Sequence, residues 1–271
     1  MTESSVVTRK YENQVGGRAD IVKLFEDHIL KPTTIHEVTN YLNMPSTISR
    51  IGPDVCAIIT NGKLIPLKQC KCCENIKHSS ALLNISSGSP HSIIMRDAAY
   101  GMSRPRVLDL KMGFRTYSDH VPEEKKRSHT KRSQGTTSSS LFMRVCGASY
   151  YHDNKKTLIS KMQGRAMTAE DLITFMKTFF DLGKEQKKLL ISQLKTVKFA
   201  LENTDAHRFF GSSLLIIVDD DTKNKTLENT VTTKLIDFSS MARSEEGSPQ
   251  YYGPDTAAIW GVSNLIDILE S

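Results

Sequence analysis

Alternating apolar and polar residues predict several short strands in the first third of the chain. The runs VCAIIT, KLIPL, ALLNIS and SIIMRD are rich in β-formers and are separated by turns such as NG and SSGSPH. Before them, QVGGRADIVKL and DHILKP predict a short strand, a Gly-Gly turn and a second strand. A helix over residues 33–43 follows, with Thr33 or Thr34 as its cap. Residues 12–97 are therefore predicted to form an antiparallel sheet with one helix.

The pattern changes after residue 98, where helical periods alternate with strands. TAEDLITFMKTFFDLG begins with a capping signature, Thr168 to Asp171, and ends on Gly183, which predicts a helix. Strands are expected at PRVLDLKMG, LFMRVCGASYY, SSLLIIV and TKLIDF, the last two joined through DDDTKNKT, and a final helix begins after Pro254. KEQKKLLISQLKTVKFALEN has one apolar helical stripe that we expect in the core: Leu190, Leu194, Val197 and Leu201.

Length and charge narrow the class of protein. A chain of 271 residues suffices for one domain with two lobes. Its net charge of +6 indicates a polyanionic partner, which could be nucleic acid, an anionic membrane or a phosphate-rich small molecule. The amino terminus lacks the apolar stretch of a signal peptide, and the run LLIIV is too short to cross a bilayer, so we expect a soluble intracellular protein.

The five cysteines show no disulfide framework, which agrees with a reducing compartment. Cys70, Cys72, Cys73 and His78 are close enough in sequence to gather around zinc. Zinc sites usually combine two CxxC or HxxxH pairs, and no second pair follows here. We therefore favour a cysteine-rich loop or edge strand over a metal site.

The stretch PRVLDLKMG places two opposite charges within an apolar strand. Alternation puts Val107, Asp109 and Lys111 on one face and the intervening apolar residues on the other. One interpretation is a salt-bridged surface strand. The other is a cleft wall, in which a carboxylate accepts ribose hydroxyls and an ammonium neutralises a phosphoryl group.

Two further charged residues also have both a structural and a functional interpretation. Asp237 ends an aliphatic strand in KLIDFSS and is either an exposed strand end or a ligand of Mg²⁺ that bridges ATP phosphates. Lys31 closes the strand HILKP and is either a solvated edge residue or a phosphate-binding lysine of a kinase-like fold, paired with Glu37 on the next helix.

A cationic segment, PEEKKRSHTKR, predicts a helix because Pro122, Glu123 and Glu124 suit a first turn. Such a segment is often only a solvated helix face. It contains no aromatic residues for stacking on single-stranded nucleic acid, so a compact polyphosphate fits it better. Its cations are Lys125, Lys126, Arg127, Lys131 and Arg132.

Together these stretches resemble the inositol polyphosphate kinase family over roughly residues 12 to 270. PRVLDLKMG matches the PxxxDxKxG signature of that family at Pro105, Asp109, Lys111 and Gly113. HRFFGSSLLIIVDD resembles its SSLL element, KLIDFSS its IDF element, and GPDTAAIWGVSNLIDIL its closing helix. The HRD, DFG and GxGxxG motifs of protein kinases do not occur. EEKKRSHTKRSQGTTS is most similar to the inositol hexakisphosphate kinases.

The resemblance implies an α+β, two-lobed kinase-like fold with ATP in the interlobe cleft. It implies a polar tail at 1–11, a first lobe at 12–97 and a second lobe at 98–271, with an inositide-binding segment at 118–135. It also implies residue roles. Asp109 would hold ribose, Lys31 the ATP phosphates, Asp237 Mg²⁺, and Lys111 the substrate and the moving phosphoryl group. Backbone groups of Arg96, Asp97 and Ala98 would face adenine, and the inositide would contact Lys125, Lys126, Arg127, His129, Lys131 and Arg132, with Lys161 as a further candidate.

The chain departs from the family pattern in two places. Ser240 stands where relatives often carry a histidine or lysine that touches substrate, so we expect a weaker contact and looser selectivity there. Arg96 replaces a common acidic residue in the connection between lobes. The chain also lacks the long insertions of many relatives.

We therefore expect a kinase that uses ATP and Mg²⁺ to convert inositol hexakisphosphate to a diphosphoinositol product. One alternative is a kinase of inositol trisphosphate or other lower inositides. A second, of another class, is a non-catalytic phosphoinositide or RNA binding module. We expect a monomer that binds no nucleic acid, lacks a membrane span, and is located in the cytoplasm or also in the nucleus.

Overall fold

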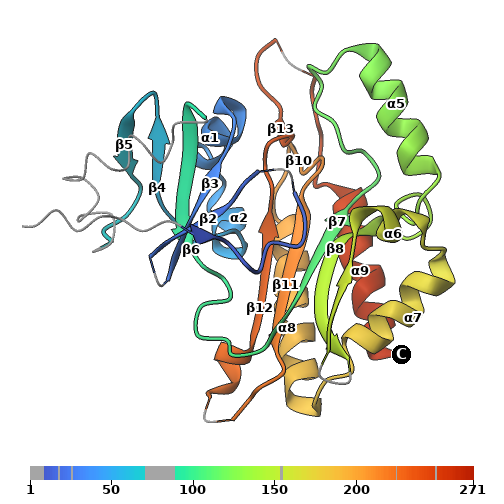
Figure 1. Cartoon of the computed structure of the whole chain (residues 1–271). Helices are drawn as coiled ribbons and strands as arrows, with labels where there is room; N and C mark the ends of the chain where they lie inside the picture. Colours follow the sequence, from blue (N-terminus) through green and yellow to red (C-terminus); the bar gives the residue numbers. More distant parts are fainter. Residues whose placement is uncertain are drawn as a thin grey trace, which may run out of the picture.

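The computed structural model describes residues 9–17, 19–25, 27–70, 89–152, 155–223, 225–247 and 249–271. Its helices and strands form two lobes, each built on an antiparallel sheet (Figure 1). The predicted α+β class with two lobes is confirmed. The first lobe contains β1 (Arg9–Lys10), β2 (Val22–Phe25), β3 (His28–Pro32), α1 (Ile35–Leu42), α2 (Ser46–Ile51), β4 (Val55–Thr60), β5 (Lys63–Pro66) and β6 (His91–Arg96).

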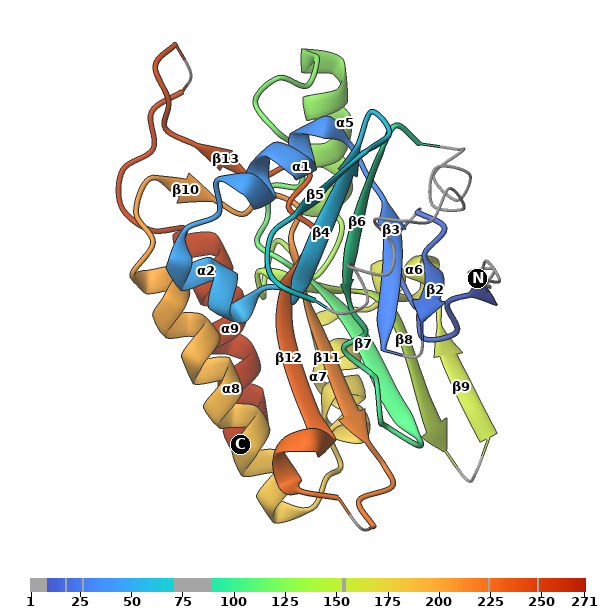
Figure 2. The ribbon, with the colours of Figure 1, turned by 90° about the vertical axis from the view of Figure 1, so that its left-hand side faces the viewer.

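The sheet of the first lobe has the order β1-β2-β3-β6-β4-β5 (Figure 2). Three of the four strands predicted between residues 55 and 97 are present, and ALLNIS lies outside the described residues. The predicted Gly-Gly turn is different: Gly16 and Gly17 belong to a long loop between β1 and β2 rather than to a hairpin turn. Arg9 and Lys10, expected in a tail, pair with β2.

Helix α1 begins as its sequence predicts, because the side chain of Thr34 accepts a hydrogen bond from the N–H of Glu37. Helix α2 was not predicted, since its six residues contain only two isoleucines. Both of these, Ile48 and Ile51, are buried in the apolar core of the second lobe. The two lobes are therefore joined by packing as well as by the connecting chain.

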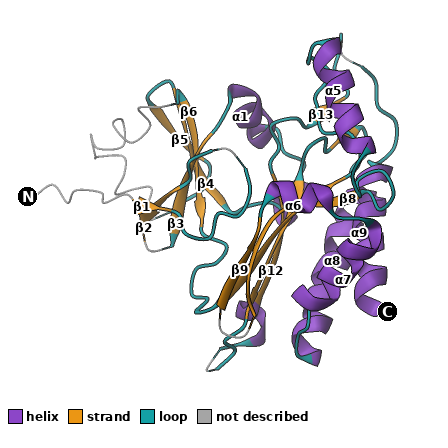
Figure 3. Cartoon of the chain, turned by 45° about the vertical axis from the view of Figure 1, so that its right-hand side comes forward, coloured by secondary structure: helices purple, strands orange, loops and turns teal. Residues whose placement is uncertain are grey.

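The sheet of the second lobe has the order β12-β11-β7-β8-β9, with α7, α8 and α9 packed against one face (Figure 3). The opposite face is turned toward the first lobe. The elements are β7 (Pro105–Met112), α5 (Glu123–Gln134), β8 (Met143–His152), β9 (Lys155–Ile159), α6 (Lys161–Ala166), α7 (Ala169–Phe179), α8 (Lys184–Glu202), β10 (His207–Arg208), β11 (Ser213–Asp219), a 3-10 turn (Leu227–Thr230), β12 (Val231–Ile236), β13 (Ala242–Arg243) and α9 (Thr256–Glu270).

Most of the predicted helices are confirmed in the second lobe. Thr168 and Asp171 form the expected reciprocal capping box of α7, and the apolar stripe of α8 is fully or almost fully buried. The end of α7 was predicted wrongly: it stops at Phe179, and Gly183 precedes α8 instead, as its amino-terminal cap. Strand β9 and helix α6 were not predicted.

In the described part of the chain, no helix has the length and apolarity needed to span a bilayer. Of the four proposed zinc ligands, Cys72, Cys73 and His78 lie outside the described residues. Cys70 is described and is partly buried.

Candidate active site

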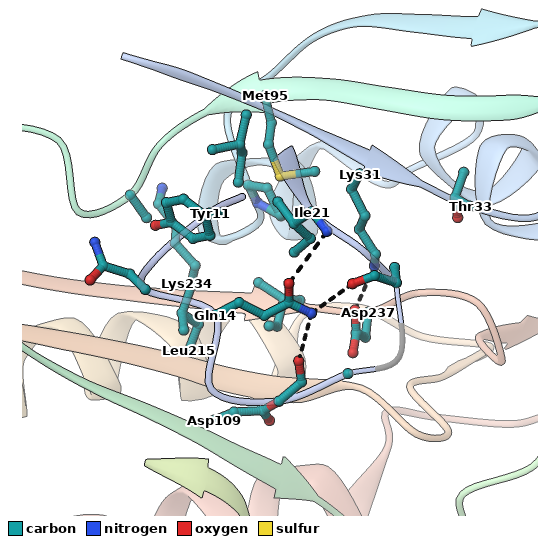
Figure 4. A pocket seen from close by; sticks show the side chains of 18 of the residues that line it. Tyr11, Gln14, Ile21, Lys31, Thr33, Met95, Asp109, Leu215, Lys234 and Asp237 are labelled. Atoms are coloured by element: carbon teal, nitrogen blue, oxygen red, sulfur yellow. Dashed lines mark hydrogen bonds and ion pairs between the residues drawn. The ribbon is translucent and has the colours of Figure 1, made fainter. Parts of the chain in front are cut away.

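A cavity of about 760 Å³ lies between the two sheets (Figure 4). Its floor is the face of the second sheet that carries no helices, and register places its residues in rows across β7, β11 and β12. One row is Asp109, Leu215 and Lys234, and the next is Val107, Ile217 and Thr232. Ile29, Met95 and Tyr41 line the cavity from the first lobe. The volume and the mostly apolar walls suit a ligand of nucleotide size.

At one end of the cavity, Lys31 joins carboxylates from both lobes. Its Nζ lies 3.0 Å from Oε1 of Glu37 on α1 and 2.6 Å from Oδ1 of Asp237, which follows β12. Glu37 also accepts hydrogen bonds from the hydroxyl of Thr33 and, at 3.1 Å, from the N–H of Phe238. The predicted pairing of Lys31 with Glu37 is therefore present, and Lys31 is not a solvated edge residue.

These contacts stabilise the ionised forms of Lys31 and Asp237. Burial alone would lower the pKa of Lys31, but Asp237 and Glu37 outweigh burial and raise it. Burial alone would raise the pKa of Asp237, but Lys31 and Lys111 outweigh it and lower this pKa. Asp237 has a φ of 64°, a left-handed backbone conformation that is uncommon for a residue other than glycine. Such conformations are frequent at functional sites.

Asp109 is buried on the cavity floor, which rules out the salt-bridged surface strand considered from the sequence. Its Oδ1 has no hydrogen-bond partner among the described residues. Burial raises the pKa of Asp109, the charge of Asp237 acts in the same direction, and Lys111 opposes them. A buried acceptor without a donor is costly, so this oxygen is suited to a ligand hydroxyl.

The described part of the loop between β1 and β2, residues 11–17 and 19–21, lines the cavity and reaches Asp109. Gln14 holds its shape by donating hydrogen bonds to the carbonyls of Gly16 and Ala19, at 3.1 and 2.7 Å, and accepting one from the N–H of Ile21 (Figure 4). A Cβ on Gly16 would stand 2.0 Å from Oδ2 of Asp109. Only glycine can approach the carboxylate this closely.

Lys111 lies one row beyond Asp109, beside the main cavity. Its Nζ donates to the carbonyl of Gly211. Gly211 packs between the backbone of Thr116 and the side chain of Ser240, so Ser240 belongs to the surroundings of Lys111. The positive charge of Lys111 favours the ionised forms of both Asp109 and Asp237.

The connection between the lobes matches the sequence prediction only in part. Arg96 and Ala98 line the cavity. Asp97 does not: its N–H bonds to the carbonyl of Asp27 at 2.9 Å, and its own carbonyl accepts from Tyr100 at 3.0 Å. Its carboxylate binds Lys23 and, at 2.5 Å, the hydroxyl of Tyr11. Asp97 therefore holds the connection together rather than facing the cavity.

The cationic segment forms the predicted helix, α5, but does not line the main cavity. It is attached to the loop after β7, because Nδ1 of His129 lies 3.1 Å from Oγ1 of Thr116. Lys126 pairs with Glu123 on the same helix at 2.7 Å. The other four cations, Lys125, Arg127, Lys131 and Arg132, form no ion pair with a carboxylate in the described ranges.

Lys161 is the first residue of α6, which crosses β8. Gly164 of this helix lies so close to the backbone of Val145 that a Cβ would stand 2.2 Å from the Val145 carbonyl oxygen. Val145 pairs with Leu110, next to Lys111. The exposed Lys161 is therefore on a helix that packs on β8, the strand next to that of Lys111.

Sequence reasoning missed several cavity residues, notably Gln14, Gly16 and Lys234. Burial lowers the pKa of Lys234, whose position inside the apolar run TKLIDF could have indicated a cleft-facing cation. The Gly-Gly pair in the sequence drew attention to Gly16. The carboxylate that Gly16 approaches, that of Asp109, is distant in sequence.

Comparison with known proteins identifies the family of this chain. The family model described as inositol polyphosphate kinase matches residues 92–270. The chain belongs to this family. Inositol hexakisphosphate kinase 3 of Mus musculus is 28% identical over 216 residues, which are 71% of this chain and 54% of the relative. The human protein of the same name is 27% identical over 226 residues, 71% of this chain and 55% of the relative. The chain thus spans about half the length of these relatives.

A solved structure, the inositol phosphate multikinase of S. cerevisiae in complex with ADP and Mn²⁺, has the same fold. It aligns with a TM-score of 0.67 at 20% identity and covers 90% of this chain and 98% of that one.

Proposed function

We propose that this protein binds ATP and Mg²⁺ in the interlobe cavity and transfers the γ-phosphoryl group to an inositol polyphosphate. The observation that supports this best is the contact of Lys31 with Asp237 at one end of the cavity, with Asp109 on the cavity floor and Lys111 one row farther along the same strand. Two cations and two carboxylates, contributed by both lobes, are the groups that phosphoryl transfer needs for binding phosphates, metal and ribose.

In this proposal the apolar walls receive adenine, beside Arg96 and Ala98. The unpartnered Oδ1 of Asp109 accepts a ribose hydroxyl, and Lys31 binds phosphate oxygens while Glu37 keeps it in place. Asp237 fits a divalent cation because its lowered pKa keeps it ionised at the cavity edge. Mg²⁺ is usually held by one or two carboxylates together with substrate phosphates, and it would neutralise phosphate charge.

We assign the binding of the transferring group to Lys111. Phosphoryl transfer passes through a loose transition state, so positioning and charge neutralisation contribute more than a strong base. The ammonium of Lys111 supplies that charge beside Asp109, and Ser240 borders the same site.

The acceptor that we propose is inositol hexakisphosphate, with a diphosphoinositol as the product. Helix α5 presents four cations without ion-pair partners among the described residues, next to the loop that follows Lys111. Charge-assisted hydrogen bonds to phosphate contribute roughly 1.5–3 kcal/mol each, so several can offset dehydration of a dense polyanion. The similarity to proteins named inositol hexakisphosphate kinases supports the same choice.

The first test is Lys111→Ala. We expect phosphoryl transfer to fall by about 100-fold or more, because a cation at the transferring group is lost. The fold should persist, since the Lys111 ammonium bonds only to the Gly211 carbonyl in the described contacts. Product formation from labelled ATP measures the effect, and Lys195→Ala, which removes an exposed surface pair with Glu270, is the control. Activity retained in a folded Lys111→Ala protein would contradict the proposal.

The acceptor is tested with Mg-ATP and a panel of purified inositides, followed by separation of the products. A diphosphate product from inositol hexakisphosphate is expected. A monoester product from inositol trisphosphate alone would identify a kinase of lower inositides. Absence of ATP consumption, together with displacement of labelled RNA by inositol hexakisphosphate, would instead identify a binding module.

A further inference from the structure

Two cysteines and a histidine meet on the face of the first sheet that is turned away from the cavity. His28 begins β3, Cys56 lies in β4, and Cys70 follows β5. Strand β6 lies between β3 and β4 (Figure 2). The side chains of His28 and Cys56 approach each other across it. Both are buried, in continuation of the apolar cluster that includes Leu30, Ile94 and Cys56.

The distances within this cluster are those of a metal site. Nε2 of His28 lies 3.3 Å from Sγ of Cys56 and 3.4 Å from Sγ of Cys70. The three ligand atoms all lie within 4.8 Å of one another. A tetrahedral zinc ion with ordinary bond lengths would hold nitrogen and sulfur about 3.6 Å apart and two sulfurs about 3.8 Å apart. Small adjustments would therefore suffice to ligate the ion.

A second observation concerns the other ring nitrogen of His28. Nδ1 lies 2.7 Å from Oδ1 of Asp27. A carboxylate at this distance favours the tautomer with the proton on Nδ1, which leaves the lone pair of Nε2 directed at the two sulfurs. Metal-binding histidines are commonly oriented by a carboxylate in this way.

The Sγ atom of Cys56 also lies 3.9 Å from the carbonyl oxygen of Asp54, a long contact for a thiol hydrogen bond. One ion bound to Nε2 and to both sulfur atoms would use all three ligand atoms at once. Thiolate and imidazole ligands together favour zinc over magnesium or calcium.

We propose that His28, Cys56 and Cys70 form a zinc site in the first lobe, with Asp27 as the carboxylate that positions His28. The ion would connect β3 and β4 to the chain that follows β5. His28 pairs with Arg96, directly before the connection between the lobes, and Asp27 accepts the N–H of Asp97. The site would therefore stabilise one end of the first sheet. The chain that connects the two lobes starts from that end. This inference does not depend on the proposed kinase activity.

Metal analysis of the whole chain tests the site. We expect equimolar zinc after purification and dialysis against metal-free buffer, and little zinc in His28→Gln, Cys56→Ser and Cys70→Ser. Cys146→Ser is the matched control, because Cys146 is a buried cysteine of β8 in the other lobe and should leave the zinc content unchanged. Asp27→Asn should keep the stoichiometry at excess zinc but weaken affinity by about 10–100-fold.

Cobalt substitution adds a spectroscopic test of thiolate ligation. Replacing a cysteine that does not bind the metal would leave the spectrum of bound cobalt unchanged. Co²⁺ bound to wild type should show thiolate charge-transfer bands, which Cys70→Ser should lose. Cys70 is only partly buried, so this variant should fold, and circular dichroism verifies that it does. Absence of zinc and cobalt binding in reduced wild type would overturn the proposal, as would a Cys56–Cys70 disulfide in its place. Undiminished zinc in folded His28→Gln and Cys56→Ser variants would also overturn it, because the metal would then be bound elsewhere.

Discussion

The carboxylate of Glu37 receives three donors, from Lys31, Thr33 and the backbone of Phe238. The last of these belongs to the second lobe, so one buried side chain sets both the position of Lys31 and the approach of the lobes. A buried carboxylate is costly unless it is hydrogen-bonded, and this one accepts hydrogen bonds at both oxygens. The geometry of the proposed phosphate site therefore depends on a residue that need not touch a ligand.

Asp219 has a comparable role outside the site. Its buried carboxylate accepts the N–H groups of Ser103 and Arg104, at 2.9 and 2.8 Å, and pairs with Lys225. Burial alone would raise the pKa of Asp219, but Lys225 and the backbone donors outweigh it and lower the pKa. The folded state thus binds fewer protons than the unfolded state. Its contribution to the unfolding free energy is complete above the unfolded pKa of about 3.9 and is lost as the pH falls through the folded pKa.

We therefore expect Asp219→Asn to lower the unfolding free energy by about 2–3 kcal/mol near neutral pH. The difference from wild type should be smaller at about pH 3, below the unfolded pKa of about 3.9, because the unfolded chain is then mostly protonated and folding must release a proton. Urea unfolding at both pH values measures this, with the exposed Asp181→Asn as the control. An equal deficit at both values would show that the ionised carboxylate is not the cause.

At the scale of elements, the loop between β1 and β2 is one of the segments that link the lobes. Val15 and Gly16 lie against β7 and β8: a Cβ on Gly147 would stand 1.8 Å from the carbonyl oxygen of Val15. Two glycines, Gly16 and Gly147, thus allow backbone to rest directly on the cavity floor. The loop covers Asp109, the residue proposed to bind ribose.

Gly16→Ala should displace this loop, because its Cβ has no room beside Asp109. We expect a KM for ATP raised by about 10-fold, equivalent to about 1.4 kcal/mol of binding, with a smaller change in kcat. Steady-state kinetics with varied ATP measures this. In Gly183→Ala the new Cβ meets open space, so that variant should behave like wild type. An unchanged KM for ATP in Gly16→Ala would place the nucleotide away from the loop.

At the scale of the whole molecule, the cavity lies between two sheets. Few stretches of the chain run from one sheet to the other. A ligand that contacts both should stabilise the assembly. By mass action, ATP at 100 times its Kd adds about 2.7 kcal/mol to the unfolding free energy. For a chain of this size that corresponds to a rise in Tm of about 5–10 °C.

We expect Mg-ATP to produce this rise in wild type and to produce almost none in Lys31→Ala, which lacks the phosphate-binding cation. Differential scanning fluorimetry measures the shift, and Lys195→Ala should retain it. If Mg-ATP raised the Tm of Lys31→Ala as much as that of wild type, the nucleotide would bind without contacting the ion-paired group of Lys31, Glu37 and Asp237.

Local sequence was sufficient for much of the fold. The caps of α1 and α7, the stripe of α8 and the alternation of β7 depend on residues within one or two turns of each other, so the sequence displays them directly. Short elements such as α2, β9 and α6 were missed because their residues show little periodicity. Gly164 lowers the helix propensity of α6, although close packing on Val145 requires a glycine there.

The sequence by itself determined the types of chemistry: a signature with a carboxylate and an ammonium on one strand face, a carboxylate at a strand end, and a cationic helix. Tertiary structure decided which of these groups meet. Lys31 contacts Asp237 from 206 positions away, and the loop of Gly16 rests on Asp109, because two sheets pack face to face. The fold likewise brings Cys70 to His28 and Cys56, which are 42 and 14 positions away in sequence. Contacts of this kind depend on how sheets are ordered and packed, and no local pattern encodes them.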